Sequence, residues 1–593
     1  MKRYLFLITA VLAALFLLAS CGCAEHLDKN GDARCDVCLQ RLPEATAPAV
    51  TTAAPGTTLA PNASLPEDRE LAERLSAALA EAYLGARLDI GLTAESAPYY
   101  RLEGEEGYVR LNADGTLEII GVRARNTLLT LKTYDGRTVY QGFYCPGQRP
   151  LSVALRRALS SEGLIASEAA DAPDTAIGAL SALSLSGTPL TDVRELSAIR
   201  YMRSLSTLDL SGCPLGDLSY LAGLTALNTL DLSYAKGLSC EDGGIMAVST
   251  LTSLQGLRHV SIVGAYAVLN RPIFDTLVTM TANGKITLSA LEGCTLDAER
   301  VGAFARTVFF SVDELLVHMR QNGGRLLPGA GFSHAVLALS AQDAEESGAL
   351  DVGTVSLIEL YGREELAFHI PIVSAGDLTV NLYSYHLRAT RENNRSGIHA
   401  GGALHVRAFG SSSVFGAGWD SPEVTYLYPG AALSGASVTV DTEVSASLTL
   451  FGGRGFIGRT GEDDGKSPSD ITTSKNGGEG GLGAPGIRAV GLVSLNSKAI
   501  RVYGGQGGRG GDGSDGSDAN IFFGGYDAGH GGRGGQGGPA VECGSLHFAA
   551  EDFSRYLFGG AGGLGGEGGS GFLGGKDGLP GDTGYTGEYV IYR

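Results

Sequence analysis

Four side chains near the start of the chain have the types and spacing of a metal site. Cys23 and His26 are separated by two residues, and so are Cys35 and Cys38. Thiolate sulfur and imidazole nitrogen in two such pairs are ligands that tetrahedral zinc prefers. The spacing therefore predicts a small zinc knuckle.

The same stretch also fits other chemistry. Oxygen ligands suited to calcium alternate along it, at Asp28, Asn30, Asp32 and Asp36. This is the spacing of a calcium-binding loop, although Ala33 stands where such a loop has glycine. A disulfide that joins Cys35 to Cys38 or uses Cys23, and a stretch without an ordered role, also stay open.

Catalytic motifs are missing from the sequence. It contains no G-x-S-x-G elbow, no H-E-x-x-H motif and no P-loop. Carboxylates that could act on a polysaccharide stand only in glycine-rich loops: Asp463, Asp464, Asp512, Asp515 and Asp518. Because no apolar residues flank them, we expect solvated turn carboxylates, and the sequence predicts a protein without catalytic activity.

Charge and glycine content narrow the possible functions. The chain has 64 acidic and 45 basic residues, a formal charge of -19, which repels the phosphates of nucleic acids. We therefore expect no nucleic-acid partner. Of its 593 residues 88 are glycine, about twice the usual share.

The first residues have the features of a secretion signal. Basic Lys2 and Arg3 precede an apolar run over 4–18, and the small residues Ala19 and Ser20 lead to Cys21. The end of this segment resembles the lipobox of bacterial lipoproteins. The resemblance implies that residues 1–20 are removed, that Cys21 carries the lipid, and that the protein lies on the extracellular face of the membrane.

Three segments follow the expected lipid anchor. Residues 21–41 resemble short Cys/His/Asp modules of Gram-positive surface lipoproteins. Residues 42–63 are rich in Pro, Thr and Ala and predict an extended linker. Over 64–150, Leu71, Leu75 and Leu79 predict an amphipathic helix, and short alternating runs predict a small β domain that loosely resembles bacterial immunoglobulin-like spacers.

One pattern of apolar residues occurs four times between Leu180 and Ile262. Its cores are Leu180/Leu183/Leu185, Leu205/Leu208/Leu210, Leu227/Leu230/Leu232 and Leu257/Val260/Ile262. This is the L-x-x-L-x-L pattern of leucine-rich repeats. The phrase Leu215-Gly216-Asp217-Leu218 resembles the internalin type, so we expect a short repeat solenoid over 151–290.

The strand residues between those leucines are expected to line a concave face. The candidate binding side chains are Ser184, Asp209, Asp231, His259 and Ser261. They are small and polar, whereas tight protein-binding faces concentrate aromatic and arginine side chains. The face therefore favours weak or glycan-like binding.

The remaining segment, 291–593, becomes rich in glycine. Three short strands end in an aromatic residue, at Phe451, Tyr503 and Phe558, and each is followed by glycine at every third position. That period is the period of polyproline II, in which glycine lets neighbouring chains approach. The segment resembles right-handed parallel β-helix adhesins with glycine-rich loops.

These observations predict a mainly β protein of several domains, with a repeat solenoid followed by a parallel β-helix. The expected role is binding or adhesion to a protein or glycan at the cell surface. The alternatives are a polysaccharide-active β-helix enzyme and a structural protein of the cell envelope.

Overall fold

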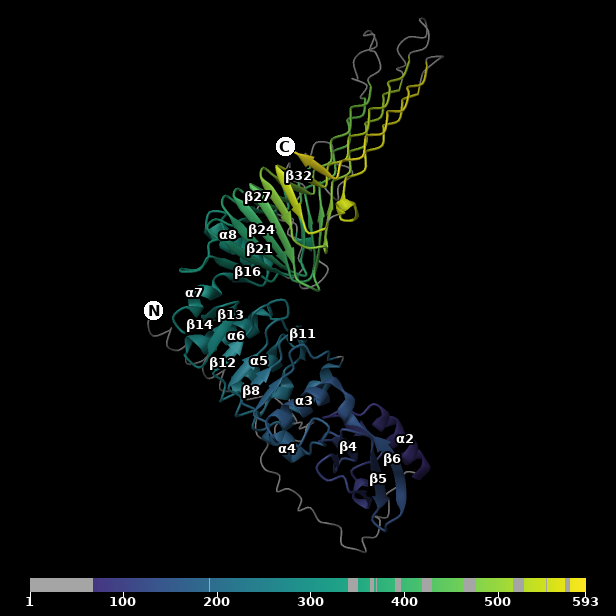
Figure 1. Cartoon of the computed structure of the whole chain (residues 1–593), viewed down its shortest axis with the longest axis vertical. Helices are drawn as coiled ribbons and strands as arrows, with labels where there is room; N and C mark the ends of the chain where they lie inside the picture. The colour runs from purple at the N-terminus through teal and green to yellow at the C-terminus, as the bar shows by residue number, and fades with distance from the viewer. Residues whose placement is uncertain are drawn as a thin grey trace, which may run out of the picture.

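The computed structural model describes residues 68–190, 192–339, 350–362, 367–368, 371–389, 396–418, 429–461, 476–515, 527–550, 552–570 and 576–593. The expected signal peptide, Cys21, the metal-binding stretch and the linker over 42–63 lie outside the described residues. Figure 1 shows an elongated molecule that runs from an N-terminal domain through two stacks of strands to a projecting arm. Among the described residues, no helix is long and apolar enough to span a bilayer.

The N-terminal domain begins with the expected amphipathic helix. α2 (Asp68–Ala80) buries Leu71, Leu75 and Leu79, one on each turn. It packs against two antiparallel sheets, ordered β1-β4-β3 and β2-β5-β6. Their strands are β1 (Arg87–Asp89), β2 (Tyr100–Glu103), β3 (Val109–Leu111), β4 (Thr116–Ile119), β5 (Thr127–Thr133) and β6 (Thr138–Tyr144).

A sheet of six strands follows, and we call this region (150–305) the leucine stack. Its strand order is β14-β13-β12-β10-β8-β7, and every pair is parallel except β13 with β14. The strands are β7 (Ala182–Ser184), β8 (Thr207–Asp209), β10 (Thr229–Asp231), β12 (His259–Ser261), β13 (Thr287–Leu291) and β14 (Cys294–Leu296).

Helices and short turns connect these strands. They are α3 (Pro150–Ser161), α4 (Asp174–Ala179), η3 (Val193–Tyr201), η4 (Ser219–Leu221), α5 (Ile245–Ser253), α6 (Arg271–Ala282) and α7 (Val301–Ala305). A second small sheet pairs β9 (Pro214–Gly216) with β11 (Lys236–Leu238).

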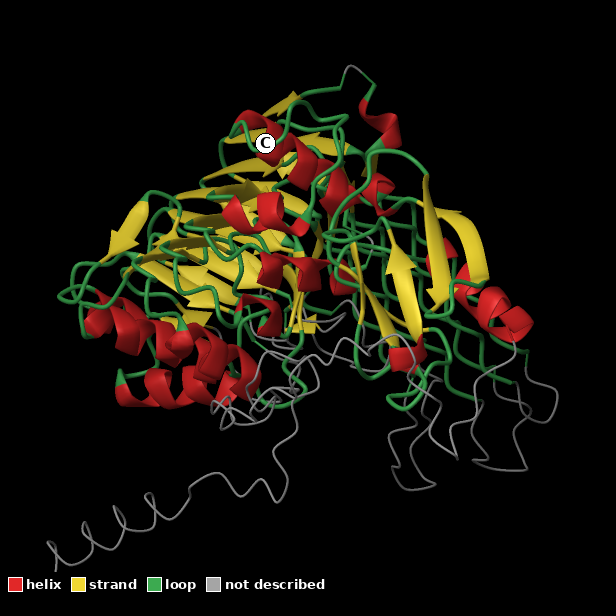
Figure 2. Ribbon diagram, turned by 90° about the horizontal axis from the view of Figure 1, so that it is seen from below, coloured by secondary structure: helices red, strands yellow, loops and turns green. Residues whose placement is uncertain are grey.

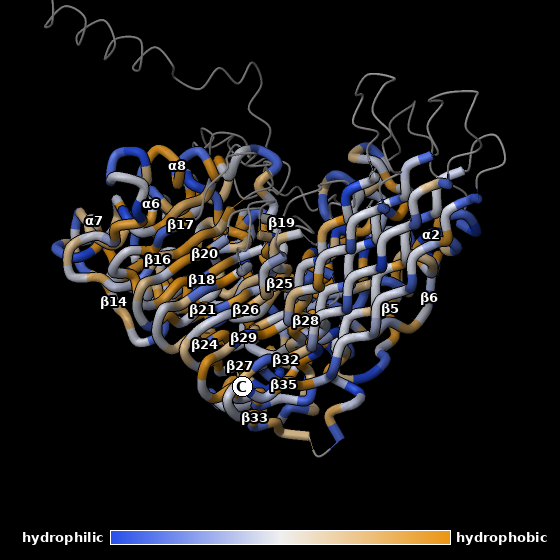
Figure 3. The backbone as a smooth tube through the Cα atoms, turned by 90° about the horizontal axis from the view of Figure 1, so that it is seen from above, coloured by the Kyte–Doolittle hydropathy of each residue, from blue (hydrophilic) through white to orange (hydrophobic). Residues whose placement is uncertain are grey.

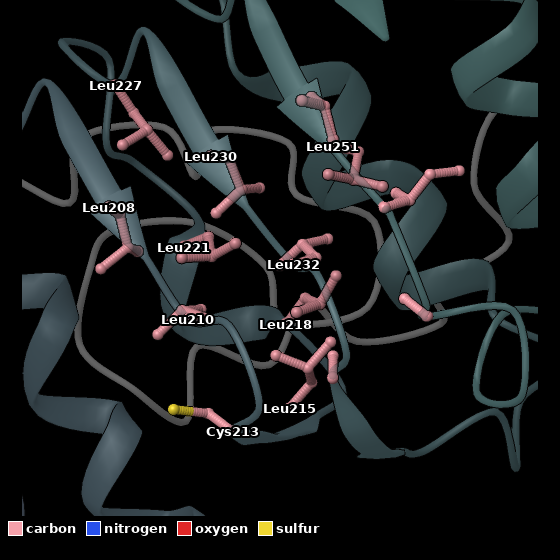
Figure 4. Packing of buried hydrophobic residues seen from close by; sticks show 14 of the residues in the cluster. Leu208, Leu210, Cys213, Leu215, Leu218, Leu221, Leu227, Leu230, Leu232 and Leu251 are labelled. Carbon is pink, nitrogen blue, oxygen red and sulfur yellow. The ribbon is translucent and has the colours of Figure 1, made fainter. Parts of the chain in front are cut away.

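Buried leucines hold the leucine stack together. The register places Leu183, Leu208, Leu230 and Val260 directly opposite one another, and all four are buried. Figure 4 shows leucines of successive turns meeting in one core, with Cys213 at its edge. Each turn therefore covers the apolar face of its neighbour, as expected for stacked repeats.

The sequence pattern misses the fifth parallel strand, β13. Leu288 lies opposite Val260 and continues the buried row. The flanking positions of the pattern hold Lys285 and Ala290 instead of two large apolar residues. One central leucine is too little for the pattern to be recognised.

The described strands between residues 308 and 592 form three long parallel sheets, which we call the three-sheet coil. From β18 onward, successive strands lie in sheets 1, 3 and 2, and each pairs with the strand three places later. α8 (Val312–Gln321) covers the first turn, with Val312 and Leu315 in the core. Figures 2 and 3 show the strands side by side through the coil and apolar residues along them.

Sheet 1 contains β15 (Val308–Phe309), β16 (His334–Leu337), β18 (Leu357–Tyr361), β21 (Leu378–Tyr383), β24 (Ala403–Ala408), β27 (Ser437–Thr442), β30 (Leu492–Leu495) and β33 (Ser545–Phe548). Sheet 2 contains β17 (Leu350–Asp351), β20 (Ile372–Ser374), β23 (Ile398–Ala400), β26 (Leu433–Gly435), β29 (Ile487–Ala489), β32 (Val541–Cys543) and β35 (Val590–Tyr592). Sheet 3 contains β19 (Ala367–Phe368), β22 (His386–Arg388), β25 (Ser411–Phe415), β28 (Ser447–Phe451), β31 (Ile500–Tyr503) and β34 (Leu557–Phe558).

The three aromatic-terminated strands of the sequence are neighbours in sheet 3. Phe415, Phe451, Tyr503 and Phe558 stack in one ladder, with ring centroids 4.7, 5.0 and 4.7 Å apart. Offset stacking at such distances is favourable, so the ladder fixes the register of the strands from which the arm grows.

Between sheets 3 and 2, three connections extend into the glycine arm that projects in Figure 1. Its outgoing runs are 452–461, 504–515 and 559–570, and its returning runs are 476–486, 527–538 and 576–587. No helix or strand is assigned to these runs. Their hydrogen bonds recur at every third residue, as in packed polyproline II chains.

Each triplet in runs 476–486, 504–511 and 528–538 donates two hydrogen bonds to other chain segments, and the triplets of the remaining runs mostly donate one. The first glycine donates to the next run of the same direction, as Gly507 N does to Ala561 O at 2.8 Å. The second donates to a run of opposite direction, as Gly508 N does to Gly481 O at 2.8 Å. The third residue, such as Arg509, faces outward. The glycine runs thus pack against one another through backbone hydrogen bonds.

The close approach of neighbouring backbones explains which triplets need two glycines. A Cβ on Gly507 would lie 1.9 Å from Gly535 O, and one on Gly508 would lie 1.8 Å from Phe456 O. Inner runs accordingly read G-G-x. The two outer runs, 452–461 and 576–587, have no further run of the arm beyond them and, apart from Gly452-Gly453, keep one glycine per triplet, so Phe456 and Pro580 are accommodated there.

The fold is therefore mainly β, as the sequence predicts, and most of its strands lie in parallel sheets.

Candidate functional site

The residues predicted for a concave face lie in two neighbouring rows of the leucine stack. Ser184, Asp209, Asp231 and Ser261 follow one another in register from β7 to β12. His259 lies in the other row, next to Thr229 and Thr287. The structure thus brings all five predicted residues onto one sheet, with neighbouring strands about 4.8 Å apart.

Hydrogen bonds order the first row. Ser184 Oγ donates to Asp209 Oδ2 at 2.7 Å, and Ser211 N donates to Asp209 Oδ1 at 2.9 Å. Partial burial raises the pKa of the Asp209 carboxyl, but these bonds outweigh it and hold that pKa below its usual value. Asp209 is therefore a fixed anion on this face.

The other end of the face is less open. His259 Nδ1 lies 2.8 Å from Thr287 Oγ1, and its Nε2 lies 3.3 Å from Ser289 Oγ. Ser261 is 9% exposed and its hydroxyl is 2.7 Å from that of buried Ser233. Ser184, Asp209, Asp231 and His259 are consequently the predicted residues that a ligand can reach.

A second polar cluster lies on the outer face of sheet 1. His405 Nε2 is hydrogen-bonded to Asp441 Oδ2, and Asn496 Nδ2 donates to Asp441 Oδ1 at 2.9 Å. Arg407 pairs with Glu443 at 3.4 Å. Partial burial raises the pKa of Asp441, but the bonds from His405 and Asn496 outweigh it and leave that pKa lowered.

Sequence reasoning missed this cluster, although a signal was present. His405 and Arg407 alternate along β24, and their partners, Asp441 in β27 and Glu443 just after its end, follow with the same offset of 36 residues. Only the parallel pairing of β24 with β27 turns that offset into contacts.

A buried acid lies near the junction of the leucine stack and the coil. Glu359 is 5% exposed and accepts a hydrogen bond of 2.6 Å from the Tyr361 hydroxyl. Burial raises its pKa, although the bond from Tyr361 works in the other direction. Tyr361 also packs on Tyr266 of the stack, with ring centroids 5.3 Å apart.

The carboxylates considered for catalysis have structural partners in the arm. Asp512 accepts from Glu567 N and Asp515 accepts from Ser570 N, both at 2.7 Å. Each thus pairs with an outward backbone amide of the next run. The other three acidic candidates, Asp463, Asp464 and Asp518, lie outside the described residues.

A groove of about 690 Å³ opens where the arm leaves the last turn of the coil. It lies between β34, β35 and the ends of the glycine runs that they join. Its main side chains are Phe553, Phe558, Thr586, Glu588, Tyr589 and Tyr592. Volume and aromatic lining are in the range of ligand-binding clefts.

Metal ligands are not gathered in the part of the chain that the structure describes, where no three His, Cys, Asp or Glu residues are placed to hold an ion. The zinc set Cys23, His26, Cys35 and Cys38 and the calcium set Asp28, Asn30, Asp32 and Asp36 lie outside that part.

Comparisons with known proteins identify no relative of the chain. No family model, no curated protein and no solved structure matches it.

Proposed function

We propose that the chain is an extracellular lipoprotein, anchored to the membrane through Cys21, that binds a protein or glycan ligand without catalysis. In this proposal the leucine stack is a leucine-rich-repeat solenoid and the three-sheet coil is a right-handed parallel β-helix. The linker over 42–63 holds both away from the membrane.

The observation that carries the binding role is the in-register row on the leucine stack. Ser184, Asp209 and Asp231 offer hydroxyl and carboxylate groups at the spacing of adjacent strands. Such a row suits an extended ligand that carries hydroxyl or amide groups, because each strand supplies one equivalent contact.

Binding assays on the full-length chain test this role. We expect an array of glycans and extracellular-matrix proteins to contain a ligand whose binding falls when Asp209 is changed to Asn. Thr188→Val, on the connecting loop, is the control. Equal binding by both variants and the parent, or no ligand at all, would contradict the proposal.

Membrane attachment is tested separately. Cys21→Ala should leave an unprocessed precursor or release the protein from the membrane fraction. A mature, acylated variant would contradict the lipid anchor.

The N-terminal stretch adds a metal to the proposal. Cys23, His26, Cys35 and Cys38 would hold zinc, and a peptide of residues 22–40 should bind one equivalent and protect its thiols from alkylation. Thiols that stay reactive in excess zinc would exclude this ligand set.

One observation favours a second function, that of a polysaccharide-active enzyme. His405 and Asp441 lie on adjacent turns of the coil, where such an enzyme needs a base and an acid. Glu359 has the raised pKa of an acid but is buried beside Tyr361. Release of reducing ends from a polysaccharide by the parent, lost in His405→Ala, would establish the enzyme instead.

A further inference from the structure

The groove at the last turn of the coil presents aromatic faces rather than a closed core. Phe558 ends the ring ladder of sheet 3: one face stacks on Tyr503 at 4.7 Å, and the residue also lines the groove. Tyr589 and Tyr592 beside it are 48% and 63% exposed. Exposed rings of this size are costly to hydrate and mark binding surfaces.

The composition of the adjacent glycine run makes this side of the arm an outer surface. Inner runs carry two glycines per triplet because a chain packs on each side. Run 576–587 instead carries Pro580, Thr583 and Thr586 where a further run would have to approach. Pro580 also lacks the amide that would bond to it.

The polar side chains of the groove form no hydrogen bonds within the described part of the protein. Among the residues that the structure describes, the side chains of Thr586, Glu588, Tyr589 and Tyr592 make no hydrogen bond to one another or to other groups. Hydroxyl and carboxylate groups are therefore available beside apolar ring faces. A pyranose has the matching surface, with an apolar C–H face and a rim of hydroxyls.

Charge selects among sugars. Glu588 is the one charged residue that lines the groove in the described part of the chain. The whole chain carries a formal charge of -19, which disfavours an anionic glycan. A neutral sugar avoids this repulsion and can donate its hydroxyls to the carboxylate.

We propose that this groove binds a neutral oligosaccharide, with its rings on Phe558, Tyr589 and Tyr592. This inference rests on the binding role proposed above and adds a ligand class and a second location to it. Recognition depends on ring stacking and hydrogen bonds rather than on ion pairs.

The test uses the full-length chain in detergent micelles. Neutral glucan and mannan hexasaccharides and an anionic oligogalacturonate are arrayed as probes, and the best neutral probe is titrated by calorimetry. We expect Tyr589→Ala/Tyr592→Ala to weaken that binding by about tenfold or more, as for buried aromatic contacts. Tyr134→Ala, an equally exposed tyrosine at 48% in the N-terminal domain, should leave it unchanged.

Salt separates the two sugar classes. Binding of the neutral probe should be insensitive to a rise from about 50 to about 500 mM sodium chloride, which screens ion pairs. Preference for oligogalacturonate with strong salt dependence would overturn the proposal.

Other outcomes distinguish a failure of the groove proposal from a failure of the proposed binding role. A neutral glycan whose binding falls in Asp209→Asn but not in the tyrosine variant would overturn the groove and keep the binding role. Self-association or peptide binding that is lost in the tyrosine variant, without any neutral glycan bound, would assign the groove to another occupant. No glycan and no protein ligand at all would contradict both proposals.

Discussion

The leucine stack and the glycine arm are both built by stacking short segments, yet opposite groups hold them together. In the stack, side chains such as Leu208 and Leu230 fill the space between turns. In the arm, backbones approach so closely that a Cβ on Gly508 would lie 1.8 Å from a carbonyl oxygen. One region is stabilised by apolar burial and the other by backbone hydrogen bonds.

The difference decides which positions can vary. A turn of the stack tolerates other small polar residues at the solvent-facing positions between its leucines, such as Ser184. An inner run of the arm tolerates variation only at every third residue, such as Gln506 or Arg509.

The largest effect is expected for Leu230→Ala in the stack. Leu230 is fully buried between Leu208 and Val260, so its truncation leaves a cavity in a core that is shared between turns. We expect a loss of about 2–5 kcal/mol in the free energy of unfolding. Urea denaturation followed by circular dichroism measures it, and an unchanged midpoint would show that burial does not hold the stack.

A smaller, local effect is expected for Gly508→Val in the arm. The added carbons would meet the backbone oxygens of Phe456 and Gly455, which cannot move aside as a side chain can. Overpacking of this kind costs about 1–3 kcal/mol. The measurement is thermal unfolding together with proteolysis of the arm.

Arg509→Val is the matched control, because the neighbouring side chain points outward. It should unfold and resist proteolysis as the parent does, apart from the loss of its ion pair with Asp512. If both variants unfold and resist proteolysis alike, glycine is not required at the inner positions of the triplets.

The junction between stack and coil should respond to pH through Glu359. Its pKa is raised in the folded protein from an ordinary value of 4.5. A raised pKa means that the folded state holds the proton of Glu359 more tightly than the unfolded state does. The stability that this group contributes is therefore fully present below about pH 4.5 and is lost as the pH rises through the folded-state pKa.

Glu359→Gln removes this dependence, and we expect the variant to be more stable than the parent at neutral pH. Urea titrations of both proteins at several pH values measure the difference. A variant that is less stable than the parent at every pH would show that the carboxylate is favourably paired.

The smallest effect is expected at the outer edge of the arm. Thr583 is exposed in run 576–587 and stands where an inner run would need glycine. Thr583→Val should change the stability by less than about 0.5 kcal/mol, as surface substitutions usually do. A loss as large as that of Gly508→Val, measured by the same thermal unfolding, would mean that another chain packs on this edge.

Sequence reasoning succeeded where one residue type repeats in phase. The leucines at 183, 208 and 230 and the glycines at 504, 507 and 510 each mark a periodic contact, and both sets lie as their periods predict. It missed β13, where a single central leucine remains of the pattern. It also missed the His405–Asp441 pair, because this contact depends on which strands become neighbours.

The sequence predicted where the residues of the candidate site lie, but not which of their side chains are exposed to solvent. The pattern put Ser261 beside Asp231, yet the hydroxyl of Ser261 is turned to Ser233 in the interior. The groove beside Phe558 had no sequence signal, because its side chains come together only where the arm rejoins the coil.

The most direct test of this account is amide hydrogen exchange over residues 504–516. Gly505, Gly507, Gly508, Gly510 and Gly511 donate to neighbouring runs, whereas the amides of Gln506 and Arg509 face outward. We predict two protected amides followed by one fast amide in each triplet from Gly504 to Asp512. Fast exchange throughout this segment would contradict the account and would show that the glycine runs are flexible linkers.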